Sequence, residues 1–208
     1  MHQSGLLGKQ WLPKYRRTGK QRFGAATGIF APILAFTCIM IAIASYPAFS
    51  WTNNALSDLG VILGITGLFF NFGLYASGLL ALNFALFGLY AYLGKTWVGK
   101  IGAAIYATST IALIAIGVFN ESYSGTHYAV SVAFFTLMPI SMFTITCAFL
   151  LNHQRRMALF TGLTGIAAAL PWVLLFEFNY VPNLAIPEFV SGLIASAWTI
   201  ILGYKMLK

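Results

Sequence analysis

Residues 25–49, AATGIFAPILAFTCIMIAIASYPAF, decide the fold class because they form a long apolar run without a charged residue. A membrane-spanning helix needs about 20 mostly apolar residues, whereas a transmembrane strand is shorter and alternates apolar with polar positions. This run is apolar on all faces, so it predicts a helix that crosses the membrane. It is too long for the apolar core of a signal peptide and lacks a small-residue cleavage signature, so we expect the helix to be retained.

Five further uncharged stretches resemble this one. The sequence therefore predicts an all-α, polytopic membrane protein, with a six-transmembrane-helix bundle over residues 25–208 and a basic N-terminal segment over residues 1–24. The expected spans are Ala25–Phe49, Phe70–Leu93, Ile101–Phe119, Tyr128–Leu151, Met157–Phe176 and Phe189–Tyr204.

The composition and the charges agree with this prediction. Of 208 residues, 59% are hydrophobic and 8% are charged, which excludes an ordinary water-soluble domain. Six spans place all twelve Lys and Arg on one side and all four Asp and Glu on the other, and basic residues favour the cytoplasmic side. We therefore expect a cell-membrane protein with both termini in the cytoplasm. The basic residues are Lys9, Lys14, Arg16, Arg17, Lys20, Arg22, Lys95, Lys100, Arg155, Arg156, Lys205 and Lys208.

The basic segment Lys9–Arg22 has two interpretations. It is either an anchor attracted to anionic lipid headgroups or a docking arm for a cytoplasmic partner, with Trp11 and Tyr15 as anchors. Nucleic acid is not an expected partner, because no binding fold accompanies the patch. Cys38 and Cys147 both lie in predicted spans, so we interpret them as packing residues and not as a disulfide.

The predicted spans carry no ionisable residue near their centres, which argues against a pump or carrier. Their central polar residues are neutral, and we expect them to form hydrogen bonds between helices. No nucleophile elbow, zinc-binding His pair or phosphate-binding loop is present. These neutral polar residues are Ser77, Asn83, Thr108, Ser109, Thr110, Ser141, Thr144 and Thr146.

Every acidic residue of the chain is expected on the outer side, together with one histidine. Carboxylates and an imidazole serve general acid–base catalysis, and they also bind divalent cations. Two interpretations therefore stay open, an acid–base site and a site for a divalent metal. The catalytic candidates are Asp58, Glu121, His127 and Glu177, and the metal-ligand candidates are Asp58, Glu121, His127 and Glu188.

Structural roles are an alternative for the same residues. Glu188 follows Pro187 at the start of the last span, where the helix dipole favours a carboxylate. Asp58 is suited to capping a turn, and His127 to the membrane interface. Glu177 either extends outward to water or faces a polar cavity, in which case we expect a partner such as His127.

The segment Asn54-Ala-Leu-Ser57-Asp58-Leu-Gly60 resembles a loop found in a family of small six-helix archaeal and bacterial membrane proteins of unknown function. The resemblance covers the whole chain at low specificity and implies a topology and candidate positions, but no activity. This sequence departs from the family's pattern at Asn120, where a proline is expected. The other positions that carry the resemblance are Phe70, Asn71, Gly73, Ser77, Gly78, Gly117, Phe119, Glu121, His127, Pro187 and Glu188.

The leading hypothesis is an outer-face site with acidic and His side chains that acts on a lipid or a small molecule, with metal-assisted hydrolysis or transfer as one form of it. The alternative is a non-catalytic subunit or assembly factor of a larger membrane complex. Membrane lipids are expected partners under both hypotheses, and a membrane-protein partner or a homo-oligomer is compatible with both. The distances among the candidate side chains distinguish a shared site from scattered surface residues.

Overall fold

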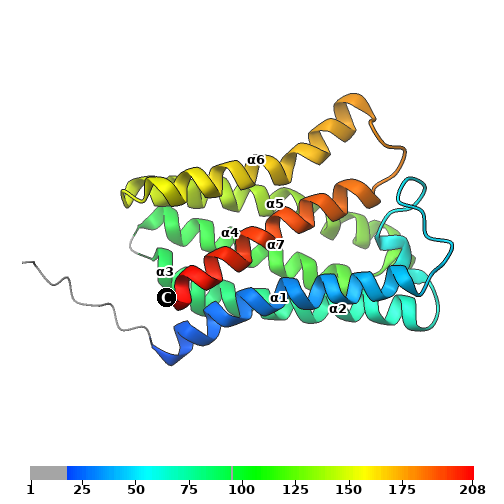
Figure 1. Ribbon diagram of the computed structural model, residues 1–208, viewed down its shortest axis with the longest axis horizontal. Helices are drawn as coiled ribbons and strands as arrows, with labels where there is room; N and C mark the ends of the chain where they lie inside the picture. Colours follow the sequence, from blue (N-terminus) through cyan, green and yellow to red (C-terminus); the bar gives the residue numbers. More distant parts are fainter. Residues whose placement is uncertain (1–17, 95) are drawn as a thin grey trace, which may run out of the picture.

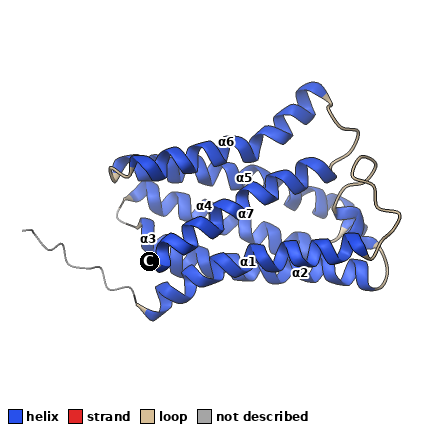
Figure 2. Cartoon of the chain, viewed as in Figure 1, coloured by secondary structure: helices blue, strands red, loops and turns tan. Residues whose placement is uncertain are grey.

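The computed structural model describes residues 18–94 and 96–208, and all regular elements within them are helices (Figures 1 and 2). Six helical segments are long and apolar enough to cross a membrane, which confirms the all-α, multi-pass fold. The 3-10 helices η1 (Ser57–Val61) and η3 (Glu121–Tyr123) lie in connections. The spans are α1 (Gly19–Ala44), α2 (Ile65–Asn83) with the π-helix η2 (Phe84–Leu89) and α3 (Tyr90–Leu93), α4 (Trp97–Val118), α5 (Ser124–Leu151), α6 (Arg155–Phe178) and α7 (Ala185–Leu207).

Helix α1 shows why helix ends differ from the ends of apolar runs. It begins at Gly19 because Thr18 and Gln21 form a capping box, in which each side chain accepts a hydrogen bond from the other residue's backbone N–H. It ends at Ala44, shortly before Pro47, because proline disfavours helical backbone in the residue before it. The last residues of the predicted basic segment are therefore helical, whereas residues 1–17, including the predicted docking anchors, lie outside the described residues.

The six spans close into a ring. Each packs against its two neighbours in the order α1, α2, α4, α5, α6, α7 and back to α1 (Figure 1). Glycine allows α1 to approach η2 closely, since a Cβ at Gly24 would lie 2.6 Å from the Gly88 nitrogen, and one at Gly28 would collide with the Phe84 ring. Pro171 interrupts the hydrogen bonding of α6, whose far end bends away from α7.

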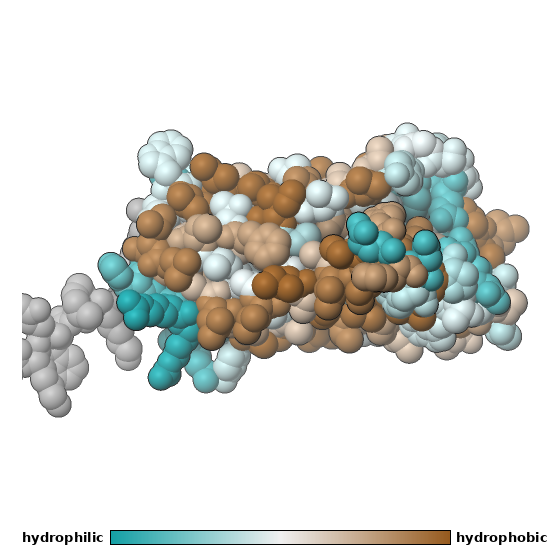
Figure 3. All heavy atoms as spheres, turned by 90° about the horizontal axis from the view of Figure 1, so that it is seen from above, coloured by the Kyte–Doolittle hydropathy of each residue, from teal (hydrophilic) through white to brown (hydrophobic). Residues whose placement is uncertain are grey.

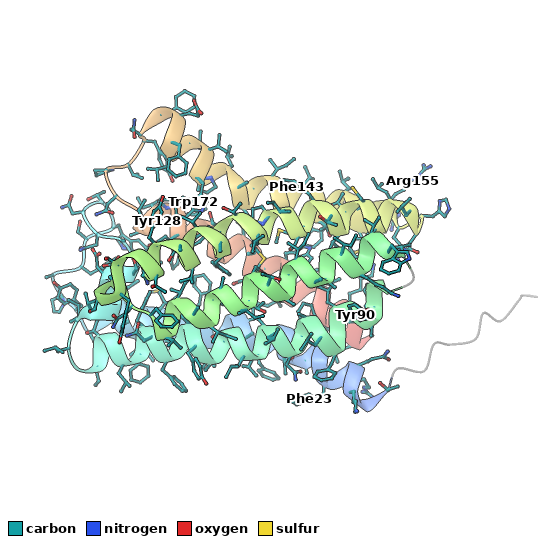
Figure 4. The ribbon with its side chains drawn as sticks, turned by 180° about the vertical axis from the view of Figure 1, so that it is seen from behind. Phe23, Tyr90, Tyr128, Phe143, Arg155 and Trp172 are labelled. Carbon is teal, nitrogen blue, oxygen red and sulfur yellow. The ribbon has the colours of Figure 1, made fainter. Side chains whose placement is uncertain are left out.

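The charges separate to the two ends of the bundle. The described Lys and Arg residues lie at one end, called the basic end, and Asp58, Glu121, Glu177 and Glu188 lie at the other, called the acidic end. Arg155 projects from the basic end in Figure 4. Hydrophobic side chains cover most of the visible face between the two ends in Figure 3. This distribution fits a protein that spans the membrane along the bundle axis.

The neutral polar residues mostly form hydrogen bonds within their own helix, so the prediction of bonds between helices is wrong for most of them. Ser109 donates to the Tyr106 carbonyl at 2.7 Å, and the other hydroxyls of the predicted set bond likewise, except at Ser77. Asn83 follows the prediction, since its Oδ1 accepts from Thr27 of α1 at 3.2 Å. A helix offers a hydroxyl a carbonyl three or four residues back, so a partner on another helix is not required.

Candidate functional site at the acidic end

The connection between α1 and α2 folds back on itself around Asp58. Asp58 Oδ2 accepts hydrogen bonds from Asn54 Nδ2 at 2.7 Å and from the Ala55 N–H at 3.1 Å. Asn54 Oδ1 in turn accepts from the Ser50 N–H at 2.9 Å. These bonds stabilise a compact turn. The next residues form η1, in which Ser57 is buried within the bundle.

Glu188 lies in the first turn of α7 and points into the bundle, with only 9% of its surface exposed. Its Oε2 accepts a hydrogen bond from the Leu56 N–H at 2.6 Å, and the Asn54 carbonyl accepts one from the Ala185 N–H at 3.0 Å. These two bonds fasten the start of α7 to the α1–α2 connection. The helix dipole accounts for an acid at this position, but the sequence does not reveal that its partner is Leu56.

Glu121 reaches the same turn from the α4–α5 connection. Its Oε1 accepts a hydrogen bond from Ser57 Oγ at 2.6 Å, and the Asp58 carboxyl lies within hydrogen-bonding reach. Asn120 orients this connection, because its Nδ2 donates to the Gly60 carbonyl at 3.2 Å. A proline, which the sequence resemblance leads us to expect here, would lack that side-chain amide, so Asn120 supplies a link between the two connections.

Asp58, Glu121 and Glu188 therefore converge on the turn at Leu56 and Ser57 from three segments of the chain. Glu188 is close enough to the other two acids for electrostatic repulsion. Since the described Lys and Arg residues lie at the basic end, none of them balances this charge. Three of the sequence-predicted acids thus form one group, which we call the acidic cluster.

His127 is buried beside this cluster, in the first turn of α5. Its Nδ1 lies 2.7 Å from the Phe119 carbonyl, and its Nε2 lies 3.4 Å from Ser131 Oγ. A carbonyl only accepts, so we assign the proton to Nδ1, which leaves Nε2 to accept from Ser131 in the neutral ring. His127 also interacts electrostatically with Glu121, so the predicted histidine belongs to the same region.

Glu177 does not join the cluster. It is exposed near the end of α6, and no hydrogen bond links it to His127 or to the loop asparagines within the described residues. Among those residues, no group of three His, Cys, Asp or Glu side chains is arranged to hold a metal ion. The metal site at Asp58, Glu121, His127 and Glu188 therefore stays a prediction.

A cavity of about 110 Å³ lies inside the ring of helices and reaches the acidic cluster at Ser57 and Glu188. Along α7 its lining extends from Glu188 to Thr199, about 16 Å of helix, so the cavity is long and narrow. Its walls are mainly apolar. They include Tyr106 and five phenylalanine rings, none of which was predicted as a catalytic or metal-binding residue: Phe36, Phe70, Phe134, Phe135 and Phe189.

Ser77 of α2 also lines the cavity, and its hydroxyl has no hydrogen-bond partner although the residue is only 1% exposed. An unpartnered buried hydroxyl is unfavourable, so it indicates a place for a polar atom of an occupant. The sequence gives one signal for this residue, its position in the family resemblance. Among the lining rings it gives the same signal for Phe70 alone, because the pattern of an inward-facing Phe is the same whether the ring fills a core or borders a cavity.

Comparison with known proteins extends over most of the chain. Residues 29–205 match the model of a family described as "Protein of unknown function (DUF998)". No curated protein and no solved structure matches the chain.

Proposed function

The chain belongs to the DUF998 family of proteins of unknown function, and we propose that this multi-pass membrane protein binds an amphipathic small molecule or lipid inside its ring of helices. The polar group of that molecule lies beside Ser57 and Glu188, and its apolar part occupies the cavity. We also propose that the acidic end faces outward and that both termini lie in the cytoplasm of a cell-membrane protein, because basic residues are retained on the cytoplasmic side.

One observation carries the proposal: the cavity is mainly apolar along its length, and a carboxyl group, that of Glu188, lines it at one end. Ser57 and Glu188 line it at the acidic end, while Ala31, Ala35 and Leu74 are among its apolar walls. Binding sites for small molecules combine such walls with a few placed polar groups. An engineered apolar cavity of about 150 Å³ binds benzene, so a volume of about 110 Å³ suits one ring or a short alkyl chain.

The acidic cluster also supports proton transfer to or from the bound molecule. Ser57 lines the cavity, and its hydroxyl donates to Glu121 at 2.6 Å. A proton that Ser57 accepts from the bound molecule can therefore be balanced by transfer of its own hydroxyl proton to the Glu121 carboxylate. Asp58 stabilises the turn that positions Ser57, and His127 interacts electrostatically with Glu121. Glu177 has no place in this chemistry, because it is exposed on α6.

Photolabelling tests the binding. A neutral alkyl probe with a diazirine at its end is added to the protein in zwitterionic liposomes, and the labelled residues are mapped by mass spectrometry. We expect label on Phe189 and Phe134, which line the cavity, and loss of that label in Gly192→Leu, which places a side chain in it. Gly125→Leu is the control, because a Cβ at Gly125 meets open space.

Label confined to lipid-facing residues such as Leu193 and Ile201, and equal in both variants, would contradict the proposal. Excess unlabelled octanol should reduce labelling of the cavity and leave labelling of these outer residues unchanged. That competition separates a saturable site from partition into the bilayer.

A further inference from the structure

We propose that the molecule bound in the cavity is a cationic amphiphile, with an organic ammonium group beside Glu188 and an apolar tail along the cavity. This inference rests on the proposed function and adds the chemical class of the ligand. Three independent features of the site support it: its carboxyl groups, its rings and its depth.

Three carboxyl groups meet at the site, and no described Lys or Arg side chain lies near them. Glu188 lines the cavity, and Asp58 and Glu121 lie close enough to repel it, while the described Lys and Arg residues are at the opposite end. Backbone N–H groups of Leu56 and Ser57 are the recorded partners of Glu188. A carboxylate has about four lone-pair sites, so Glu188 can accept from a further donor. An ammonium group supplies that donor, and its positive charge favours the ionised carboxylate of Glu188 over the protonated acid.

Aromatic rings line the same cavity as the Glu188 carboxyl group. Phe189 follows Glu188 directly and lines the same cavity, as does Phe36 of α1. The Phe36 and Phe189 rings meet edge to face at 5.2 Å between centroids, and Trp51 meets Phe189 in the same way at 5.0 Å. Ring faces attract cations, most strongly where water is excluded. Rings and a buried acid together favour an organic cation over an anion or a neutral alcohol.

The depth of the cavity favours an amphiphile over a bare ion. The apolar walls continue past Phe70 and Phe134, where a metal ion would leave the space unfilled. The unpartnered hydroxyl of Ser77 is in these deeper walls, since α2 begins at the acidic end and Ser77 lies about 18 Å along it from Ile65. An occupant that extends from Glu188 towards Ser77 pairs its ammonium group with the carboxyl group and fills the apolar space beyond it, and a polar atom in its tail would bond to the Ser77 hydroxyl.

The experiment compares three probes of equal chain length, octylammonium, octanol and octanoate, on the full chain in nanodiscs of zwitterionic lipid. Binding is measured as the rise in the thermal unfolding temperature with probe concentration, since a ligand that binds the folded state stabilises it. We expect octylammonium to bind about tenfold more tightly than octanol, because its bond to Glu188 is charge-assisted, and octanoate to bind most weakly. This ranking is obtained on the unaltered chain and needs no variant to fold.

Two matched variants locate the selectivity. Glu188→Gln keeps an oxygen for the Leu56 N–H but removes the charge, so the preference for octylammonium over octanol should disappear. Glu177→Gln removes the exposed acid of α6 and should leave the preference unchanged. Gly192→Leu should remove the stabilisation by all three probes, which separates binding in the cavity from partition into the lipid.

The outcomes distinguish the two proposals. If the three probes bind equally, or if Glu188→Gln keeps the preference, the ligand is not selected as a cation, although the cavity still binds amphiphiles. If none of the probes stabilises the unaltered chain, the proposed function and this inference both fail.

Discussion

The interiors of the two halves of the bundle are packed differently. Towards the basic end, large side chains fill the interior beyond the cavity, and Phe84, Phe149 and Trp198 are fully buried. In the acidic half, the interior holds a cavity, and three carboxyl groups meet beside it. The same six helices therefore provide a rigid support at one end and a site at the other.

The two halves also differ in the interactions that stabilise them. Close packing through Gly24, Gly28 and Gly88 brings α1 against η2 in the basic half, so dispersion contacts are dense there. The acidic half forgoes some of those contacts and is held by hydrogen bonds between connections. A site that is stabilised by polar links at its rim keeps its interior open for an occupant.

The largest expected effect concerns the two ends themselves, which the proposed topology assigns to opposite sides of the membrane. In a Cys38→Ala, Cys147→Ser background, Thr52→Cys lies in the α1–α2 connection and Gln154→Cys between α5 and α6. A membrane-impermeant maleimide applied to intact cells should modify the first and should modify the second only after permeabilisation. The reverse pattern would invert the orientation, and the background chain without added cysteine is the control.

The next effect compares one substitution in both halves. Phe84→Ala removes a fully buried ring that packs edge to face on Tyr106 at 5.7 Å, and it should cost about 3–5 kcal/mol. Phe36→Ala removes a partly exposed ring beside the cavity, and it should cost less than about 2 kcal/mol. Unfolding in mixed micelles at increasing SDS concentration measures both, and equal losses would show that the halves are packed alike.

Glycine-to-alanine substitutions compare the packing of the two halves with a smaller expected change in stability. Gly28→Ala places a Cβ against the Phe84 ring and should destabilise the fold by about 1–3 kcal/mol. In Gly192→Ala the new Cβ meets only Phe36 Cζ, at 3.6 Å, so the variant should be neutral or gain up to about 1 kcal/mol from its better helix propensity. The same unfolding titration applies, and a loss at Gly192 as large as that at Gly28 would contradict an open acidic half.

The sequence predicts the fold well because its long apolar runs show that the surrounding medium is a lipid bilayer. An uncharged run such as residues 25–49 has few structural solutions in a bilayer, so the six spans follow from composition. Helix ends follow less well, since they depend on local chemistry such as the cap at Thr18. Orientation stays a prediction from the basic residues, because the structure contains no membrane.

The sequence predicts which residues form the acidic cluster, but it does not predict their hydrogen-bond partners. The excess of acids on one side identifies Asp58, Glu121 and Glu188, but it also includes Glu177, which is exposed near the end of α6. The hydrogen bonds of Ser57 to Glu121 and of Leu56 to Glu188 join residues that are remote in sequence, and no local pattern specifies them. The cavity is a property of packing and has no sequence signature of its own.

The smallest expected effect tests the polar rim against a hydroxyl that serves only its own helix. Ser57→Ala deprives Glu121 of a 2.6 Å hydrogen bond at a partly buried position, and it should cost about 1–2 kcal/mol. Ser109→Ala removes a fully buried hydroxyl whose partner is the Tyr106 carbonyl of the same helix, and it should change stability by less than about 0.5 kcal/mol. SDS titration measures both variants, and Glu121→Gln combined with Ser57→Ala should cost less than the sum of the single changes, because the two residues share one bond. Additive losses would mean that the Ser57–Glu121 bond does not stabilise the rim, and the polar links would then have to be sought at Glu188.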